Sequence, residues 1–253
     1  MPATIDRSED TTLYSDTHLY DTMTWGGCEP LYLDAATRSG GPVLELACGT
    51  GRMLVPMAQA GIDITGIDMS APMLTVARQR LATVGASATI VEGDMSRFTF
   101  AAPFAFVFSA INSLLHLTTT ADLRSCFASV RRSLRPDGSF MFDIVNFQPS
   151  FLATPDQRQK VGEYDSEIYG RYRIEETVRY DAASQIAHKT FLYSAEGAAD
   201  FRVVTFPLRV IYPQELEALL ALEGLRLASR FGDRSGAPFH AESPSQVCIA
   251  RPF

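Results

Sequence analysis

The feature that most constrains this chain is a short apolar run followed at once by a turn of small residues, VLELACGTGR, residues 43–52. An apolar run of this length predicts a buried strand, and a turn rich in glycine lets backbone approach a neighbour closely. That neighbour is either a ligand or a packed helix, and the turn alone leaves both readings open. The rest of the chain has to decide between them.

Beyond this turn, short apolar runs alternate with longer amphipathic ones. We expect strands at 43–47, 62–67, 87–92, 104–109 and 139–145, and helices at 52–60, 71–83 and 120–134. Ser70 can cap the second of these helices, and Thr119 or Thr120 can cap the third. Strands that alternate with helices at this spacing predict a parallel sheet with right-handed crossovers.

The pattern changes after Phe147, where period-two alternation replaces helical periodicity as far as Tyr212. We expect three antiparallel strands there, separated by the turn-like stretches DAAS and EGAAD. A helix at 213–224 and strands near 225–231 and 245–251 then complete the main sheet. The predicted fold class is therefore α/β: a doubly wound, mostly parallel seven-stranded sheet with an inserted antiparallel β subdomain and an N-terminal helical cap.

Composition excludes several classes of function. The 253 residues are 46% hydrophobic and 20% charged, which is typical of a soluble globular protein. A net charge of −7 without a dense Lys/Arg run argues against nucleic acid or an anionic membrane as the main partner. No apolar run approaches the ~18 residues of a membrane helix, and the N-terminus lacks a signal-peptide pattern. We therefore expect a soluble, cytoplasmic protein.

The four cysteines, Cys28, Cys48, Cys126 and Cys248, are scattered along the chain. They form no CxxC pair and show no metal-type spacing. We expect reduced thiols and no metal site.

Carboxylates follow the strands at the edge where open parallel sheets bind ligands. Asp68 ends the second strand, where a carboxylate can accept both hydroxyls of a ribose. Asp94 and Met95 follow the third strand and offer an adenine an acceptor and an apolar edge. Glu45 lies inside an apolar run and needs a donor such as an α-ammonium group. A ligand with an amino acid at one end, a ribose in the middle and adenine at the other fits this spacing.

Taken together, these motifs resemble those of the class I S-adenosylmethionine-dependent methyltransferases. VLELACGTG is similar to the glycine-rich motif of that family, GIDMS to its acidic second-strand end, VEGDM to its third-strand turn, and SLRPDGSFMFDI to its connection into the fifth strand. The resemblance covers residues 40–146 well and 212–251 more loosely. It implies a Rossmann-like fold and S-adenosylmethionine as the cofactor, with S-adenosylhomocysteine as the product. Ala47 departs from the fuller pattern, which often has glycine there.

The resemblance also implies where the cofactor lies. Its methionine end would lie near Glu45, Ala47 and Gly49, and its ribose on Asp68. The adenine would lie near the residues that follow the second and third strands. The full set expected at the cofactor is Tyr20, Trp25, Glu45, Ala47, Cys48, Gly49, Arg52, Asp68, Met69, Met73, Asp94, Met95 and Ala110.

Two parts of this set have an alternative interpretation that involves no contact with the cofactor. Arg52 is either an exposed first-turn residue or a group that reaches the cofactor carboxylate. Tyr20 and Trp25 belong to an aromatic N-terminus that resembles the cap of small-molecule methyltransferases, or they only pack a terminal helix. A phosphate-binding role for the turn is disfavoured, because no P-loop lysine follows Gly51.

Methyl transfer from a sulfonium is an in-line displacement, so the main task of the protein is to hold a nucleophile close and aligned, which contributes about 7–11 kcal/mol. The loop after the fourth strand lies at the ligand edge, and Asn112 and His116 are its polar groups that could reach an acceptor. We expect these two as the catalytic residues, with His116 either a base or a packed core histidine. Asp143 and Asn146, near the end of the fifth strand, are further candidates.

We expect three parts: a helical cap in residues 1–38, an S-adenosylmethionine-binding domain in residues 39–146 and 212–253, and inserted strands in residues 147–211. The insertion would wall an acceptor pocket or form a dimer interface. Its aromatic residues would line that pocket or form the core of the insertion itself. They are Phe147, Phe151, Tyr169, Tyr172, Phe191 and Tyr193.

The function expected from these observations is methyl transfer to a nitrogen or oxygen of a small-molecule acceptor, in natural-product metabolism. The partners expected are that acceptor and a second copy in a homodimer, with neither nucleic acid nor membrane. Carbon methylation and a catalytically silent cofactor-binding module are alternatives. An NAD-dependent dehydrogenase is disfavoured, because its fingerprint has glycine where this chain has Leu54.

Overall fold

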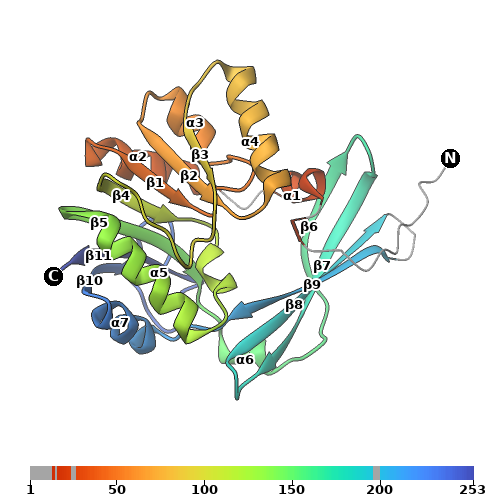
Figure 1. The fold of residues 1–253 in the computed structure, drawn as a ribbon. Helices are drawn as coiled ribbons and strands as arrows, with labels where there is room; N and C mark the ends of the chain where they lie inside the picture. The colour runs from red at the N-terminus through yellow and green to blue at the C-terminus, as the bar shows by residue number, and fades with distance from the viewer. Residues whose placement is uncertain (1–12, 15, 24–26, 196–199) are drawn as a thin grey trace. The chain divides into compact units, whose positions relative to one another are not determined.

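The computed structural model describes residues 13–14, 16–23, 27–195 and 200–253. The chain divides into two units (Figure 1). One consists of residues 1–24 and 148–210, and the other of residues 25–147 and 211–253. The N-terminal segment expected as one cap is thus shared between them.

The larger unit is built on a seven-stranded sheet in the order β10-β11-β5-β4-β1-β2-β3. Its strands are β1 (Val43–Leu46), β2 (Ile64–Asp68), β3 (Thr89–Glu92), β4 (Phe104–Ser109), β5 (Leu134–Val145), β10 (Leu225–Phe231) and β11 (Ser245–Pro252). Neighbours among β1 to β5 pair in parallel, whereas β11 runs antiparallel to β5 and β10. The chain order reverses between β1 and β4, the switch point where such sheets bind ligands. The predicted α/β class, with a doubly wound, mostly parallel seven-stranded sheet, is confirmed.

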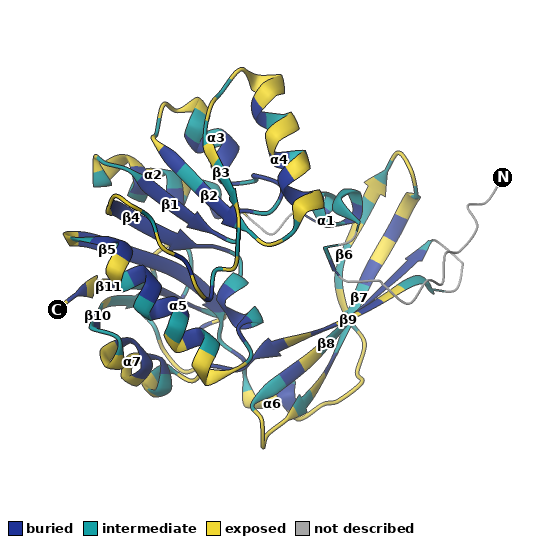
Figure 2. Ribbon diagram, viewed as in Figure 1, coloured by how far each residue is buried: buried dark blue, intermediate teal, exposed yellow. Residues whose placement is uncertain are grey.

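Helices cover both faces of this sheet (Figure 1). They are α2 (Glu29–Ser39), α3 (Leu54–Gln59), α4 (Ala71–Val84), the short 3₁₀ helix η1 (Ser113–His116), α5 (Thr120–Ser133) and α7 (Pro213–Leu222). Two predicted caps are confirmed: Ser70 accepts from the amide of Met73 at 3.5 Å, and Thr119 from the amide of Asp122 at 3.0 Å. All residues of β1 and β4 are buried, as expected for central strands of a sheet covered on both faces (Figure 2).

The smaller unit is a four-stranded antiparallel sheet in the order β6-β7-β8-β9. Its elements are α1 (Thr17–Thr22), α6 (Pro149–Leu152), β6 (Gln159–Ser166), β7 (Gly170–Asp181), β8 (Ile186–Ala195) and β9 (Asp200–Arg209). The sequence predicted three inserted strands, whereas this sheet has four. The strand that the prediction missed, β6, lies at the edge of the sheet and has no fully buried residue, so it lacks the apolar alternation that marks the others.

Side-chain contacts attach α1 to this antiparallel sheet. Asp16 caps α1 through the amide of Leu19 and also accepts from the Tyr169 hydroxyl at 2.9 Å. Arg202 pairs with the same carboxylate at 3.1 Å. Thr22 hydrogen-bonds the hydroxyl of Tyr172. These contacts explain why α1 belongs with the inserted strands.

Within the described part of the chain, none of the helices has the length and apolarity that a membrane crossing requires. All four cysteines are buried and none forms a disulfide.

Candidate functional site

The turn after β1 takes its shape from three left-handed residues. Ala47, Gly49 and Gly51 have φ values of 56°, 53° and 81°. Glycine adopts this conformation freely, whereas alanine adopts it at a cost. The amide of Cys48 donates to a carbonyl of β2 at 3.0 Å, which binds the turn to the end of that strand. A Cβ on Gly66 would lie 2.7 Å from the Cys48 sulfur, so this close approach requires glycine in β2.

Asp68 fixes the same turn from the end of β2. Its carboxylate accepts from the amides of Gly49 and Ser70, each at 2.8 Å. Burial raises the pKa of Asp68, and the backbone hydrogen bonds oppose that rise. The side chain is only half-buried, and a carboxylate offers about four lone-pair sites. The residue expected to hold a ribose therefore has acceptor capacity left after it has fixed the turn.

Glu45 is a carboxylate with an unused oxygen. It lies in the middle of β1 and is 3% exposed. Its Oε2 is buried without a hydrogen-bond partner among the described residues. Burial, and then the negative charge of Asp68, raise the pKa of Glu45 well above its ordinary 4.5. Two neighbouring carboxylates, one of them buried and incompletely paired, favour a cationic ligand.

The other residues expected beyond β2 and β3 differ in exposure. Met69 is 75% exposed, while Met73 on α4 is 1% exposed and packs inward. The carboxylate of Asp94 accepts from the amide and the hydroxyl of Ser96, both at 2.7 Å. Met95 is half-buried beside it. An adenine at this edge would thus meet Met69 rather than Met73 as an open apolar side chain.

The remaining residues expected at the cofactor are Ala110, Arg52, Tyr20 and Trp25. Ala110 is buried where β4 ends, and Arg52 is half-buried at the start of the turn into α3. Tyr20 belongs to the smaller unit, where its ring lies 5.7 Å from that of Tyr14. Trp25 lies outside the described residues. The roles expected for these residues stay predictions.

The loop after β4 contains both residues expected to be catalytic. Asn112 accepts from the amide of Val145 through Oδ1 at 2.6 Å, so its carboxamide oxygen is engaged within the fold. If Asn112 contacts the methyl acceptor, it would therefore do so through its NH₂ group. His116 ends η1, and burial lowers its pKa to about 4. The imidazole is neutral at pH 7 and a weak base.

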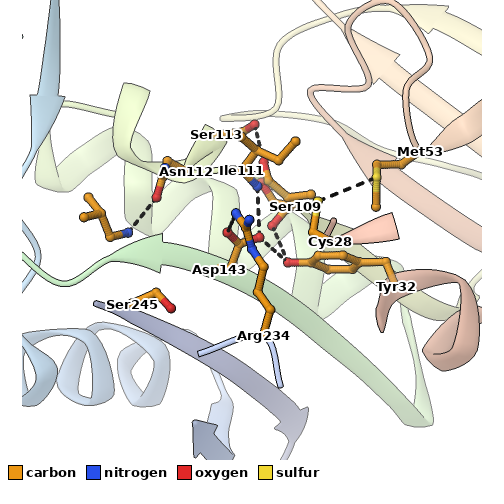
Figure 3. A network of polar contacts seen from close by, with 12 residues as sticks. Cys28, Tyr32, Met53, Ser109, Ile111, Asn112, Ser113, Asp143, Arg234 and Ser245 are labelled. Carbon is orange, nitrogen blue, oxygen red and sulfur yellow. Dashed lines mark hydrogen bonds and ion pairs between the residues drawn. The ribbon is translucent and has the colours of Figure 1, made fainter. Parts of the chain in front are cut away.

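A buried carboxylate, Asp143, lies beside this loop at the end of β5 (Figure 3). It is 2% exposed and accepts from the Tyr32 hydroxyl at 2.6 Å, from the Ile111 amide at 2.9 Å and from Arg234 at 2.8 Å. The sequence identified Asp143 as a candidate but missed Tyr32 and Arg234. These partners lie 111 and 91 residues away along the chain, and no local pattern joins residues so distant.

No group of three or more His, Cys, Asp or Glu side chains within the described ranges could hold a metal ion.

Comparison with known proteins matches residues 43–138 to the family model described as a methyltransferase domain. The dTDP-3-amino-3,4,6-trideoxy-alpha-D-glucopyranose N,N-dimethyltransferase of Streptomyces venezuelae is 29% identical over 204 residues, which are 79% of this chain and 81% of its own. The chain spans about half the length of some other curated relatives. One of them, YqeM of Bacillus subtilis, is 35% identical over 114 residues, 45% of this chain and 46% of its own.

Solved structures extend the match to both units. The CcbJ methyltransferase from Streptomyces caelestis is 27% identical, covers 90% of this chain and 95% of its own, and has a TM-score of 0.76. A glycopeptide N-methyltransferase, MtfA, solved in complex with S-adenosylmethionine, is 26% identical over 90% of this chain, with a TM-score of 0.60. These similarities support S-adenosylmethionine as the cofactor predicted for this chain. This chain is therefore similar to methyltransferases, through the family match over residues 43–138 and through solved structures that cover 90% of it.

Proposed function

We propose that this protein transfers the methyl group of S-adenosylmethionine to an amino group of a small-molecule acceptor, in the class of amino sugars or related natural products. The observation that carries the cofactor assignment is the unpaired Oε2 of buried Glu45. The acceptor class is supported by the relative from Streptomyces venezuelae, whose name states N,N-dimethylation of an amino sugar and which matches 79% of this chain.

An amine is favoured over a hydroxyl by the residues of the β4 loop. A neutral amine attacks a methyl group without prior deprotonation, whereas a phenol or alcohol benefits from a base. The pKa of His116, lowered by burial to about 4, makes that histidine a poor base for a hydroxyl acceptor. Proximity and alignment can carry most of the rate for an amine.

The residues of this chain divide the work as follows. Glu45 would pair with the ammonium group of the cofactor, and Asp68 would accept from its ribose hydroxyls. The left-handed turn after β1 lets backbone amides approach the methionine end. When bound, S-adenosylmethionine supplies an electrophilic methyl group on a sulfonium. The amine lone pair forms the new C–N bond as the C–S bond breaks, and the surplus proton passes from the methylated amine to water.

The experiment is a transfer assay with S-adenosylmethionine labelled in its methyl group. The panel holds a dTDP-linked 3-amino sugar, the same sugar nucleotide with a 3-hydroxyl in place of the amine, and a simple phenol. We expect label on the amino sugar and none on its matched hydroxyl partner. Transfer to the hydroxyl compounds alone would overturn the amine assignment. Binding of S-adenosylhomocysteine without transfer to any amine would favour a silent cofactor-binding module.

A further inference from the structure

The loop that follows β4 has an unfavourable backbone. Two consecutive residues, Ile111 and Asn112, have φ values of 57° and 63°. Asparagine tolerates the left-handed region, but a β-branched residue such as isoleucine rarely adopts it. Such a conformation persists only where the surrounding structure over-determines it, and it concentrates at functional sites.

Hydrogen bonds to β5 supply that restraint. The Asp143 carboxylate accepts from the amide of Ile111 at 2.9 Å, and its backbone carbonyl accepts from the amide of Asn112 at 3.2 Å. The Asn112 side chain also bonds to β5: its Oδ1 accepts from the amide of Val145 at 2.6 Å. Both left-handed residues are therefore held by the same short stretch of β5.

The Asp143 carboxylate is itself held from two other elements (Figure 3). The hydroxyl of Tyr32, on α2, donates to Oδ1 at 2.6 Å, and Arg234, between β10 and β11, donates to Oδ2 at 2.8 Å. Burial and the nearby Asp143 charge raise the pKa of Tyr32 well above 10, so Tyr32 remains a donor. Burial alone would lower the pKa of Arg234, but the charge of Asp143 and their hydrogen bond outweigh it and raise the pKa.

We propose that Asp143 is a positioning residue for the acceptor, because its carboxylate, oriented by Tyr32 and Arg234, imposes the left-handed conformation on the β4 loop. The inference rests on the proposed function, since this loop holds the residues expected to meet the acceptor. It assigns no cofactor contact to Asp143. The cofactor turn follows β1, and β4 lies between β1 and β5 in the sheet.

The first test measures the loop without any acceptor. Hydrogen exchange followed by mass spectrometry reads peptides that span residues 110–116 in the wild type, Tyr32→Phe and Asp143→Asn. Tyr32→Phe keeps the buried ring and removes only its donor, so it preserves the fold. We expect exchange in this segment to accelerate about 10-fold in both variants, which corresponds to about 1.4 kcal/mol of lost protection, with β1 and β2 unchanged in Tyr32→Phe. The control is Asp137→Asn, an exposed aspartate of the same strand. Unchanged exchange in both variants would overturn the proposal.

The second test measures catalysis with the dTDP-linked 3-amino sugar as acceptor. We expect Asp143→Asn to lower kcat about 10–100-fold through misplacement of the loop, with affinity for S-adenosylhomocysteine unchanged. Adding Ile111→Gly should restore part of the rate, because glycine adopts φ near 57° without an anchor. A purely structural role predicts no such rescue, and its absence would overturn the proposal. If the wild type fails to methylate the sugar while the exchange result holds, the proposed function fails and the anchoring of the loop stands.

Discussion

Two buried carboxylates in the same sheet, Glu45 on β1 and Asp143 on β5, are in opposite situations. Among the described residues, Glu45 is 3% exposed and its Oε2 has no partner, while Asp143 is 2% exposed and accepts from three donors. A fully paired carboxylate can hold the fold together, whereas an incompletely paired one costs stability until a ligand completes it. The contrast therefore separates a residue that stabilises the fold from one whose carboxylate is available to a ligand.

The turns beside these two carboxylates also differ in how their backbone conformation is fixed. The turn after β1 uses Gly49 and Gly51 at two of its three left-handed positions, so much of its shape follows from residue type. The loop after β4 uses Ile111 and Asn112, which need external hydrogen bonds. One turn is thus shaped locally, and the other depends on Asp143.

The largest expected effect is on folding. Asp143→Ala removes the carboxylate that accepts from the half-buried Arg234 guanidinium and from the buried Tyr32 hydroxyl. We expect the free energy of unfolding to fall by about 3–5 kcal/mol, measured by urea denaturation with circular dichroism. Asp137→Ala, the exposed control in β5, should change it by no more than about 0.5 kcal/mol. A loss below about 1 kcal/mol for Asp143→Ala would mean that the paired carboxylate does not hold the fold.

Next in size is the effect of Asp68 on cofactor binding. Asp68→Ala removes the acceptor expected for the ribose and releases the amide of Gly49. Calorimetric titration with S-adenosylhomocysteine should show binding weaker by about 1–3 kcal/mol. Asp63→Ala, an exposed aspartate just before β2, serves as the control. Equal affinity in wild type and Asp68→Ala would remove Asp68 from the cofactor site.

Sequence patterns predicted that a turn follows β1 and that Asp68 ends β2, because each position is encoded by neighbouring residues. The seven-stranded sheet was predicted for the same reason. The strand β6 was missed because an edge strand with no fully buried residue shows little apolar alternation. Tyr32 and Arg234 were missed because α2 and the segment after β10 meet Asp143 only in the folded chain. The attachment of α1 to the inserted sheet depends on Asp16, whose partners lie more than 150 residues away.

A smaller effect is expected in the pH dependence of stability. The folded protein without cofactor raises the pKa of Glu45 above 4.5, so it binds that proton more tightly than the unfolded chain does. Protonated Glu45 therefore stabilises the folded protein at low pH. This contribution to the free energy of unfolding should fall as the pH rises above about 4.5. The readout is the difference between wild type and Glu45→Gln in urea denaturation at several pH values. A difference that stays constant with pH would contradict the raised pKa of the incompletely paired Glu45.

The smallest effect is expected at His116. Burial lowers its pKa to about 4, so it is already neutral across pH 5–8 and should add no limb to the pH-rate profile there. With an amine acceptor, His116→Ala should lower kcat by less than about 10-fold, because proximity carries most of the rate. Initial rates measured against pH with the amino sugar check both statements. A loss of 10²–10⁴-fold would identify His116 as a general base.

The most direct test of the contrast between the two carboxylates is titration of Glu45→Gln with S-adenosylhomocysteine, with thermal unfolding of the same cofactor-free protein. Glutamine keeps the shape of the side chain and removes its charge. The predicted result is affinity weaker by about 10–100-fold, the effect of one hydrogen bond to a charged group, together with cofactor-free stability at pH 7 that is equal to or higher than that of the wild type. Unchanged affinity together with lower cofactor-free stability would contradict the assignment, because Glu45 would then serve the fold as Asp143 does.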